Sequence, residues 1–329
     1  MSEGKDKLKI GLYWAASCGG CEIAVLDIDE AILDVVAKAD IVFWPVAMDV
    51  KYKDVENMED GYMDICFFNG GIRTEENEAL AKLLRRKSKI LVAFGACACH
   101  GGDIGLANLS TREELLKTAY INTPSTDNKE NIMPVKETEV KEGKLELPLL
   151  VPKLKTLDMV VDVDYYIPGC PPSPNIILDA LKAVFEGKLP PRGSVLAPPH
   201  NLCKDCPRNT NKGEETPPAK SMPDIKRIYE VDEIDEDKCF LEQGLICMGP
   251  VTRAGCNHRC IKGNHPCTGC FGPAEGVLDP GAKMISVIGS LLEVEDEKEA
   301  EALAEKIKDY IGTFYMYDYP KSMLGGWRK

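Results

Sequence analysis

The chain has 329 residues, of which 44% are hydrophobic and 28% are charged, and its formal net charge is −13. This length allows two folded domains, and the acidic balance argues against a nucleic-acid partner, because a phosphate backbone requires a basic face. Residues 1–7 are not followed by the apolar core that a signal peptide would have, and no apolar run is long enough to span a membrane. We therefore expect a cytoplasmic protein without a membrane span.

The first half of the chain alternates short apolar strands with helical patterns. We expect strands at residues 8–14, 41–44, 63–68, 90–94 and 164–167, and helices at residues 22–37, 75–86 and 175–185. This order predicts an α/β fold, a flavodoxin-like doubly wound parallel sheet with right-handed crossovers. Residues 103–162 interrupt the pattern, and the charged stretch 120–144 predicts a solvated excursion or a partner-facing loop.

The second half is organised differently. Prolines recur without periodicity between residues 190 and 223 and mark a linker, so we expect domains at residues 1–189 and 190–329. The second domain is poor in strand patterns, and we expect a small irregular and helical domain built around bound metal clusters. Helices are expected at residues 281–292 and 296–311. The aromatic segment 314–319, together with Trp327, is expected to be buried, at an interface in preference to its own domain.

Twelve of the fourteen cysteines fall into three sets of four, numbered here in chain order. The first set is Cys18, Cys21, Cys97 and Cys170; the second set is Cys203, Cys206, Cys239 and Cys247; the third set is Cys256, Cys260, Cys267 and Cys270. Four thiolates suit a cubane iron–sulfur cluster or a structural zinc ion. Disulfides are not expected in a chain without an export signal, so we interpret these cysteines as metal ligands.

Each cysteine of the first set follows a predicted strand. Because the carboxyl ends of parallel strands share one edge of a sheet, these four thiols are expected to converge there. Glycine and alanine neighbours, and three sites close enough to form a relay, favour iron–sulfur clusters over zinc. A nucleotide site is not expected, because the loop at residues 17–21 lacks a phosphate-binding pattern.

Six motifs carry a resemblance to a known family. They are CGGC at residues 18–21, GACACHGG at 95–102, PGCPP at 168–172, CPR at 206–208, CMGP at 247–250 and HPC-x2-C at 265–270. In this order they resemble the small subunit of nickel–iron hydrogenases along nearly the whole chain. The resemblance implies a hetero-oligomeric oxidoreductase whose small subunit carries proximal, medial and distal iron–sulfur clusters. These clusters conduct electrons away from the nickel–iron centre of a separate large subunit, and no catalytic residue is expected in this chain.

By this resemblance the first set holds the proximal cluster, the third set the medial cluster and the second set the distal cluster. Standard members use a histidine at the distal site, in His-x2-Cys-Pro-Arg, where this chain has Cys203, with His200 as the rival ligand. Standard members also have a medial three-iron cluster with proline at the fourth position, near which Cys260 falls here. The resemblance, with these two departures, implies three 4Fe–4S clusters.

Both departures resemble the cytoplasmic branch of methanogens. This branch is the coenzyme F420-non-reducing (methyl-viologen-reducing) hydrogenase, which works with an iron–sulfur (delta-type) acceptor subunit and heterodisulfide reductase in methanogenesis. The gamma subunit of F420-reducing hydrogenase is one alternative. A quinone oxidoreductase subunit related to respiratory complex I is another, although such chains lack the cysteine-rich second half. A zinc-stapled scaffold protein is a third.

A few further residues have open roles. Cys66 is interpreted as a core residue, while Cys99 could replace Cys97 as a ligand. Glu22 could relay protons, orient the cluster loop or favour the start of a helix through the helix dipole. Three histidines, at positions 100, 258 and 265, are expected to donate hydrogen bonds to sulfur.

Overall fold

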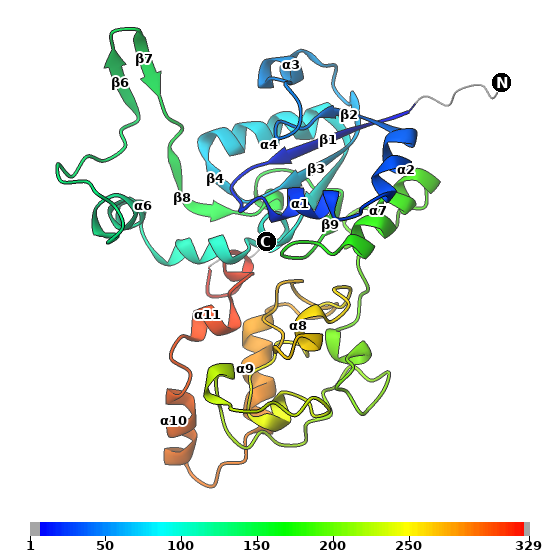
Figure 1. Ribbon diagram of the computed structural model, residues 1–329, viewed down its shortest axis with the longest axis vertical. Coiled ribbons are helices and arrows are strands. Elements are labelled where there is room, and N and C mark those ends of the chain that lie inside the picture. Colours follow the sequence, from blue (N-terminus) through cyan, green and yellow to red (C-terminus); the bar gives the residue numbers. More distant parts are fainter. Residues whose placement is uncertain (1–6, 326–329) are drawn as a thin grey trace.

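The computed structural model describes residues 7–325 and contains a five-stranded parallel sheet (Figure 1). The strand order is β2-β1-β3-β5-β9. The bounds are β1 Leu8–Trp14, β2 Ala39–Phe43, β3 Met63–Asn69, β5 Ser88–Phe94 and β9 Tyr165–Ile167. This confirms the predicted α/β doubly wound sheet, and its order reverses between β1 and β3. Trp327 and residues 1–6, on which two expectations rest, lie outside the described residues.

Helices cover both faces of the sheet (Figure 1). One face carries α1 (Gly20–Leu26), α2 (Ala31–Lys38) and α7 (Pro174–Glu186), and the other carries α3 (Tyr52–Asn57), α4 (Glu75–Lys87) and α5 (Ala96–His100). Neighbouring side chains of a strand point to opposite faces, so Phe67 is buried in one apolar cluster and Phe68 in the other. Burial on both faces explains why the strands are continuously apolar.

The helix expected over residues 22–37 is two helices. The chain leaves α1 after Leu26, and Asp29 has the left-handed φ of 53° before α2 begins at Ala31. A single left-handed residue breaks the helical hydrogen bonding without disturbing the apolar periodicity, which is why the pattern looked continuous.

The insertion between α5 and β9 is only partly the predicted excursion. It contains η1 (Asp103–Leu109), α6 (Arg112–Lys117), η2 (Thr118–Asn122), β6 (Glu137–Val140), β7 (Gly143–Glu146), β8 (Leu150–Lys155) and η3 (Leu157–Met159). All residues of the β6–β7 hairpin are exposed, and it projects from the body (Figure 1). In contrast, β8 pairs with β4 (Ile72–Thr74), and buried Asn108 exchanges two hydrogen bonds with the backbone of Leu154, at 2.7 and 2.9 Å. The returning strand is therefore part of the packed body.

Residues 190–325 form short helices and loops around one apolar cluster. The helices are η4 (Leu202–Asp205), η5 (Ile228–Glu230), η6 (Leu241–Gln243), α8 (Arg259–Lys262), α9 (Pro280–Leu291), α10 (Glu297–Glu305), α11 (Tyr310–Phe314) and η7 (Tyr319–Lys321). The cluster includes Phe240, Met284 and Phe314. From this separate cluster we propose the division into a first domain, residues 1–189, and a second domain, residues 190–329.

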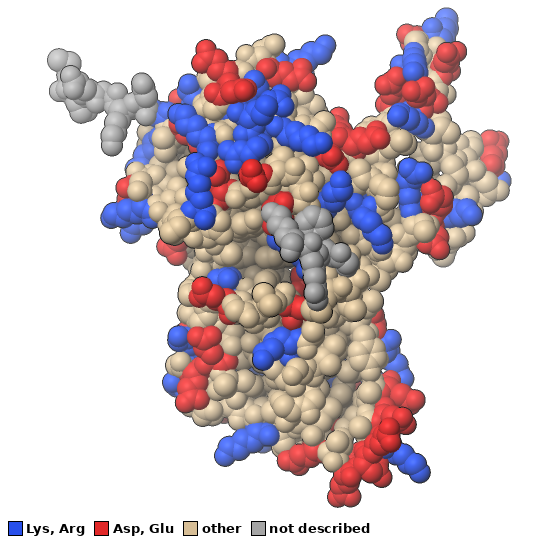
Figure 2. Space-filling model, turned by 180° about the vertical axis from the view of Figure 1, so that it is seen from behind, with Lys and Arg blue, Asp and Glu red and all other residues tan. Residues whose placement is uncertain are grey.

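The helix expected over residues 296–311 is also divided. It ends at Glu305, and Asp309 caps the separate helix α11 by accepting a hydrogen bond from the Gly312 N–H at 2.8 Å. The acidic side chains of α10 gather at one end of the molecule (Figure 2). The aromatic segment is largely buried, since Phe314, Tyr315 and Tyr319 belong to the apolar cluster of the second domain.

The buried carboxylate of Asp164 offers a test of the sheet packing. It accepts hydrogen bonds from Arg85 Nη1 at 2.6 Å and from the Leu91 N–H at 2.8 Å, and so joins α4, β5 and β9. We expect Asp164→Ala to lower the free energy of unfolding by about 3–5 kcal/mol, because it removes the only carboxylate bonded to the largely buried Arg85 guanidinium, within the described residues, and leaves a buried N–H unpaired. Anaerobic urea unfolding measures the change. The exposed neighbour Asp162 is the control, and Asp162→Ala should change the free energy by less than about 0.5 kcal/mol; equal effects would contradict this role.

Candidate metal centres

The first cysteine set converges at the carboxyl edge of the sheet, although it spans nearly half of the chain. Cys18 and Cys21 follow β1, Cys97 lies in α5 after β5, and Cys170 follows β9. The thiol of Cys21 lies close enough to the other three for their charges to interact. The four cysteines that were expected to meet at the carboxyl edge of the sheet therefore do lie close together.

Glycines make the space for these sulfur atoms. A Cβ at Gly95 would stand 2.3 Å from Cys21 Sγ, and a Cβ at Gly102 would stand 2.5 Å from Cys97 Sγ. Both glycines have positive φ, 87° and 64°, which other residues rarely adopt. Any side chain at either position would displace a thiol.

Burial disfavours the charged thiolate form of the cysteines in the first set. It raises the pKa of Cys97 to about 12 and that of Cys170 to about 11, with further increases from the neighbouring thiols and Asp103. The pKa of Cys21 is also raised, first by burial and then by Cys97. Because ligation requires thiolates, bound cations must supply the compensating charge.

All four thiols of the second set line one cavity. Its other walls are mainly apolar, with Leu202, Phe240 and Pro250 among them, and Arg208 lies beside it with its guanidinium 4.2 Å from the Phe240 ring. His200 is not among the lining residues. Its Nε2 lies 2.5 Å from Asp205 Oδ2, whereas Cys203 faces the cavity.

The third set also lines one cavity, with a volume of about 130 Å³. Cys260 is exposed and Cys267 is buried, but both contribute to this cavity together with Cys256 and Cys270. A single water occupies roughly 10–15 Å³ on a comparable scale, so the third set has room for a group much larger than one ion.

The third set adjoins both of the other sets. Cys170 of the first set and Cys270 of the third set are close enough for their thiol charges to interact. On the other side, the Cys267 N–H points to Sγ of Cys247 in the second set, at 3.4 Å. Chain order and spatial order therefore differ.

The donor chemistry fits iron–sulfur clusters. Each set offers four thiols, and glycines or apolar side chains surround them. Within residues 7–325, no group of three or more His, Cys, Asp or Glu side chains is spaced to hold a single metal ion.

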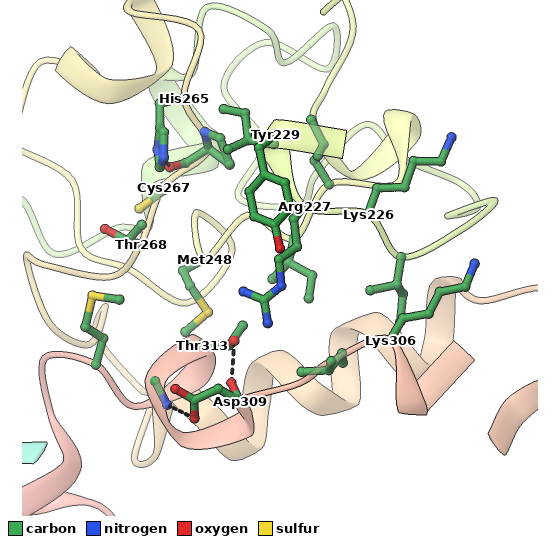
Figure 3. Close-up of a pocket in the computed structure, with 18 of the residues that line it drawn as sticks. Lys226, Arg227, Tyr229, Met248, His265, Cys267, Thr268, Lys306, Asp309 and Thr313 are labelled. Carbon is green, nitrogen blue, oxygen red and sulfur yellow. Dashed lines mark hydrogen bonds between the residues drawn. The ribbon is translucent and has the colours of Figure 1, made fainter. Parts of the chain in front are cut away.

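A further cavity of about 380 Å³ lies beside the third set (Figure 3). Cys267 and Met248 contribute to its wall, and the Arg227 guanidinium points into it. Exposed Lys226 and Tyr229 belong to its rim, so water reaches the Cys267 side of the third set. Solvent access is one of the factors that set the potential of an iron–sulfur cluster.

Two cysteines lie apart from the sets. Cys66 is fully buried in β3. The Cys99 thiol points into the sheet, where Ala93 O lies 3.2 Å and Ile167 O lies 3.5 Å from Sγ. Cys99 is still near enough to Cys21 and Cys97 for their thiol charges to interact, although its Sγ is directed at these two carbonyl groups.

Glu22 is buried beside Cys21 and is held by two donors. Its carboxylate accepts hydrogen bonds from Trp44 Nε1 and, at 3.1 Å, from Asn69 Nδ2. Asn69 in turn accepts a bond from Ser17 Oγ in the cysteine loop, at 3.1 Å. Neither Trp44 nor Asn69 was predicted from the sequence, although the position of Asn69 at the end of a strand was a usable signal.

The three histidines make other contacts than expected. His258 Nε2 lies 2.9 Å from Leu202 O, and His265 Nδ1 lies 2.8 Å from Pro266 O. His100 is buried, and its Nε2 has no hydrogen-bond partner within residues 7–325. Burial lowers the pKa of His100 to about 3, so its ring is neutral.

No helix in the described part of the chain is both long and apolar enough to cross a bilayer.

Comparisons with known proteins give a consistent assignment. The family described as NADH ubiquinone oxidoreductase, 20 Kd subunit, matches residues 18–184. The F420-non-reducing hydrogenase iron–sulfur subunit of Archaeoglobus profundus is 40% identical over 318 residues, which cover 96% of this chain and 98% of that protein. The corresponding F420-non-reducing hydrogenase subunit of Methanothermobacter thermautotrophicus is 38% identical over 321 residues, covering 97% and 96%. Sulfhydrogenase 2 subunit delta of Pyrococcus furiosus is 25% identical over 290 residues, covering 88% and 95%.

These similarities extend over both halves of the chain and include the cysteine-rich second half. They confirm the resemblance that the six motifs carry. The chain belongs to the family of F420-non-reducing hydrogenase iron–sulfur subunits.

Proposed function

We propose that this chain is the electron-transfer small subunit of a [NiFe] hydrogenase. Its relatives are named as hydrogenase subunits, so we assign it to an oxidoreductase that acts on H2, with the H2-cleaving site on a separate large subunit. The observation that carries the proposal is the presence of three four-thiol sets, of which the third adjoins both others. When bound, iron–sulfur clusters would supply one-electron redox centres at these sets.

We assign one 4Fe–4S cluster to each set. The first set would be proximal to the large subunit, the third medial and the second distal. The ligands would be Cys18, Cys21, Cys97 and Cys170; Cys256, Cys260, Cys267 and Cys270; and Cys203, Cys206, Cys239 and Cys247. The placement of Cys203 in the thiol-lined cavity, with His200 against Asp205, supports the all-cysteine distal site.

The protein's own contribution is to position these sites and to adjust their surroundings. Buried ligands such as Cys21 and Cys203 exclude water, and the apolar walls lower the local dielectric constant. Backbone N–H groups approach sulfur, as in the contact from Gly20 N to Cys18 Sγ at 3.4 Å. Such hydrogen bonds, together with burial, determine cluster potentials.

The proposed partners are the large subunit and an iron–sulfur (delta-type) acceptor subunit of the heterodisulfide reductase system. Names of the relatives support the F420-non-reducing branch over the F420-reducing one. A complex I-like quinone oxidoreductase subunit would account for residues 18–184 but not for the eight cysteines that follow residue 200. Cysteines that hold metal instead of forming disulfides are typical of a reducing compartment, so we propose a cytoplasmic location.

Metal and sulfide analysis tests the proposal directly. Protein purified without oxygen should contain about twelve iron atoms and about twelve acid-labile sulfides per chain, as three cubane clusters require. About four irons would instead favour the quinone-type alternative. Zinc without sulfide would identify a metal-stapled scaffold and contradict the proposal.

Cys260 tests the medial assignment. Cys260→Pro should convert the medial cluster to a 3Fe–4S centre with a raised potential, because a cube that lacks one protein ligand loses the iron at that corner. Electron paramagnetic resonance of the oxidised protein should then show a new signal and about one iron fewer per chain. Cys66→Ala, at a buried cysteine outside the sets, is the control and should leave the spectrum unchanged. An unaltered spectrum in Cys260→Pro would mean that the fourth ligand is another residue.

Cys203 and His200 give opposite expectations for the distal site. Cys203→Ser should alter or remove one cluster signal, because it replaces a sulfur ligand by a poorer oxygen ligand. His200→Ala removes a side chain that contacts Asp205 and should leave all three cluster signals intact. Iron analysis and reductive titration followed by electron paramagnetic resonance measure both variants. The reverse pattern would assign His200 as the ligand.

A further inference from the structure

Residues 315–322 run from the second domain back to the first, and we call this segment the strap. Its aromatic side chains anchor it in the second domain. Tyr315 and Tyr319 are buried there, and the Tyr315 ring packs so closely on Gly281 of α9 that a Cβ at that glycine would stand 2.2 Å from the ring. Just beyond the strap, the Met323 N–H donates to Asp279 Oδ2 at 2.8 Å.

The other side of the strap touches the helix that carries Cys97. The Gly102 N–H, just after α5, donates to Tyr317 O at 3.0 Å. The Pro320 ring packs on Gly101 and Gly105, where an added Cβ would come within 2.3 and 2.5 Å of it. Since Gly102 also borders Cys97 Sγ, the strap closes one wall of the first cysteine set.

Lys321 fastens the strap to the first domain. Its ammonium donates to Cys99 O at 3.1 Å and pairs with Asp158 Oδ2 at 2.7 Å. Asp158 also accepts bonds from Tyr166 OH at 3.1 Å and Thr156 Oγ1 at 2.6 Å. Burial alone would raise the pKa of Asp158, but the neighbouring Lys321 lowers it, so the pair is ionised.

The Tyr317 side chain lies where two cysteine sets meet. Its hydroxyl is next to Thr268, which stands between two cysteines of the third set, and it is near Cys270 and Cys170. Burial raises the pKa of Tyr317 to about 12, so the phenol is neutral there.

We infer that the strap is a positioning element that fixes the separation of the first and third cysteine sets. Tyr317, Pro320 and Lys321 hold α5 and the Cys170 loop against the segment of Cys267 and Cys270. The consequence for electron transfer rests on the proposed function, because tunnelling between redox centres slows steeply as their separation grows. The link between the two domains does not rest on the proposed function, because it is argued only from the contacts of Tyr317, Pro320 and Lys321.

Hydrogen–deuterium exchange of the cluster-loaded protein tests the link. Lys321→Met should leave iron and sulfide contents unchanged. It should accelerate amide exchange about tenfold or more across residues 96–109 and 317–322, because these segments can then separate without breaking the Lys321–Asp158 ion pair. It should also weaken the magnetic interaction between the reduced clusters of the first and third sets. Lys306→Met is the matched control, since the Lys306–Asp224 pair lies wholly within the second domain and should not affect residues 96–109.

A second variant distinguishes loss of the strap's contact with the first domain from a general loss of stability. Asp158→Asn should reproduce the faster exchange, and the double variant should be no faster than either single one, because both remove the same pair. Additive effects, or faster exchange confined to residues 317–322, would overturn the inference. Absence of iron from the unaltered protein would overturn the proposed function, while the exchange data would still decide the role of the strap.

Discussion

The close burial of many thiols is the constraint on which the rest of this structure depends. Removing Cys97, Cys170 and Cys247 from water raises their pKa values to about 11 or 12, and neighbouring thiols add to the effect. Without metal such groups are neutral thiols, and a bound cluster must displace their protons, because ligation requires the thiolate form. The left-handed glycines and the apolar cavity walls are the local conditions under which these thiols can converge.

Much of the fold and the thiol convergence could be predicted from the sequence. Apolar strands alternating with helices fixed the parallel sheet, and the shared carboxyl edge of such a sheet brought Cys18 and Cys170 together. Other features depend on tertiary contacts or on one dihedral angle. The left-handed Asp29 leaves no periodic signal, and Asn108 holds β8 through contacts made 46 residues away. The order of the three sets was implied by resemblance, not by spacing.

The two halves of the chain bring their cysteines together in different ways. In the first domain a regular sheet carries the ligands, and its edge aligns residues from distant segments. In the second domain the regular structure is short helices, and two sets of four thiols line cavities beside one apolar cluster. We expect the second domain to depend on its metal for stability more strongly than the first, because metal binding contributes folding free energy where the core is small.

The position of the strap in the sequence has a consequence for biosynthesis. Residues 315–322 are translated after Cys270, the last of the twelve cysteines in the three sets. Domains fold progressively as they leave the ribosome, so α5 emerges long before the segment that covers it. During that interval the Cys97 side of the sheet edge lacks the wall that Tyr317 and Pro320 form over Gly101 and Gly102. That wall forms only when residues 315–322 fold back onto the first domain.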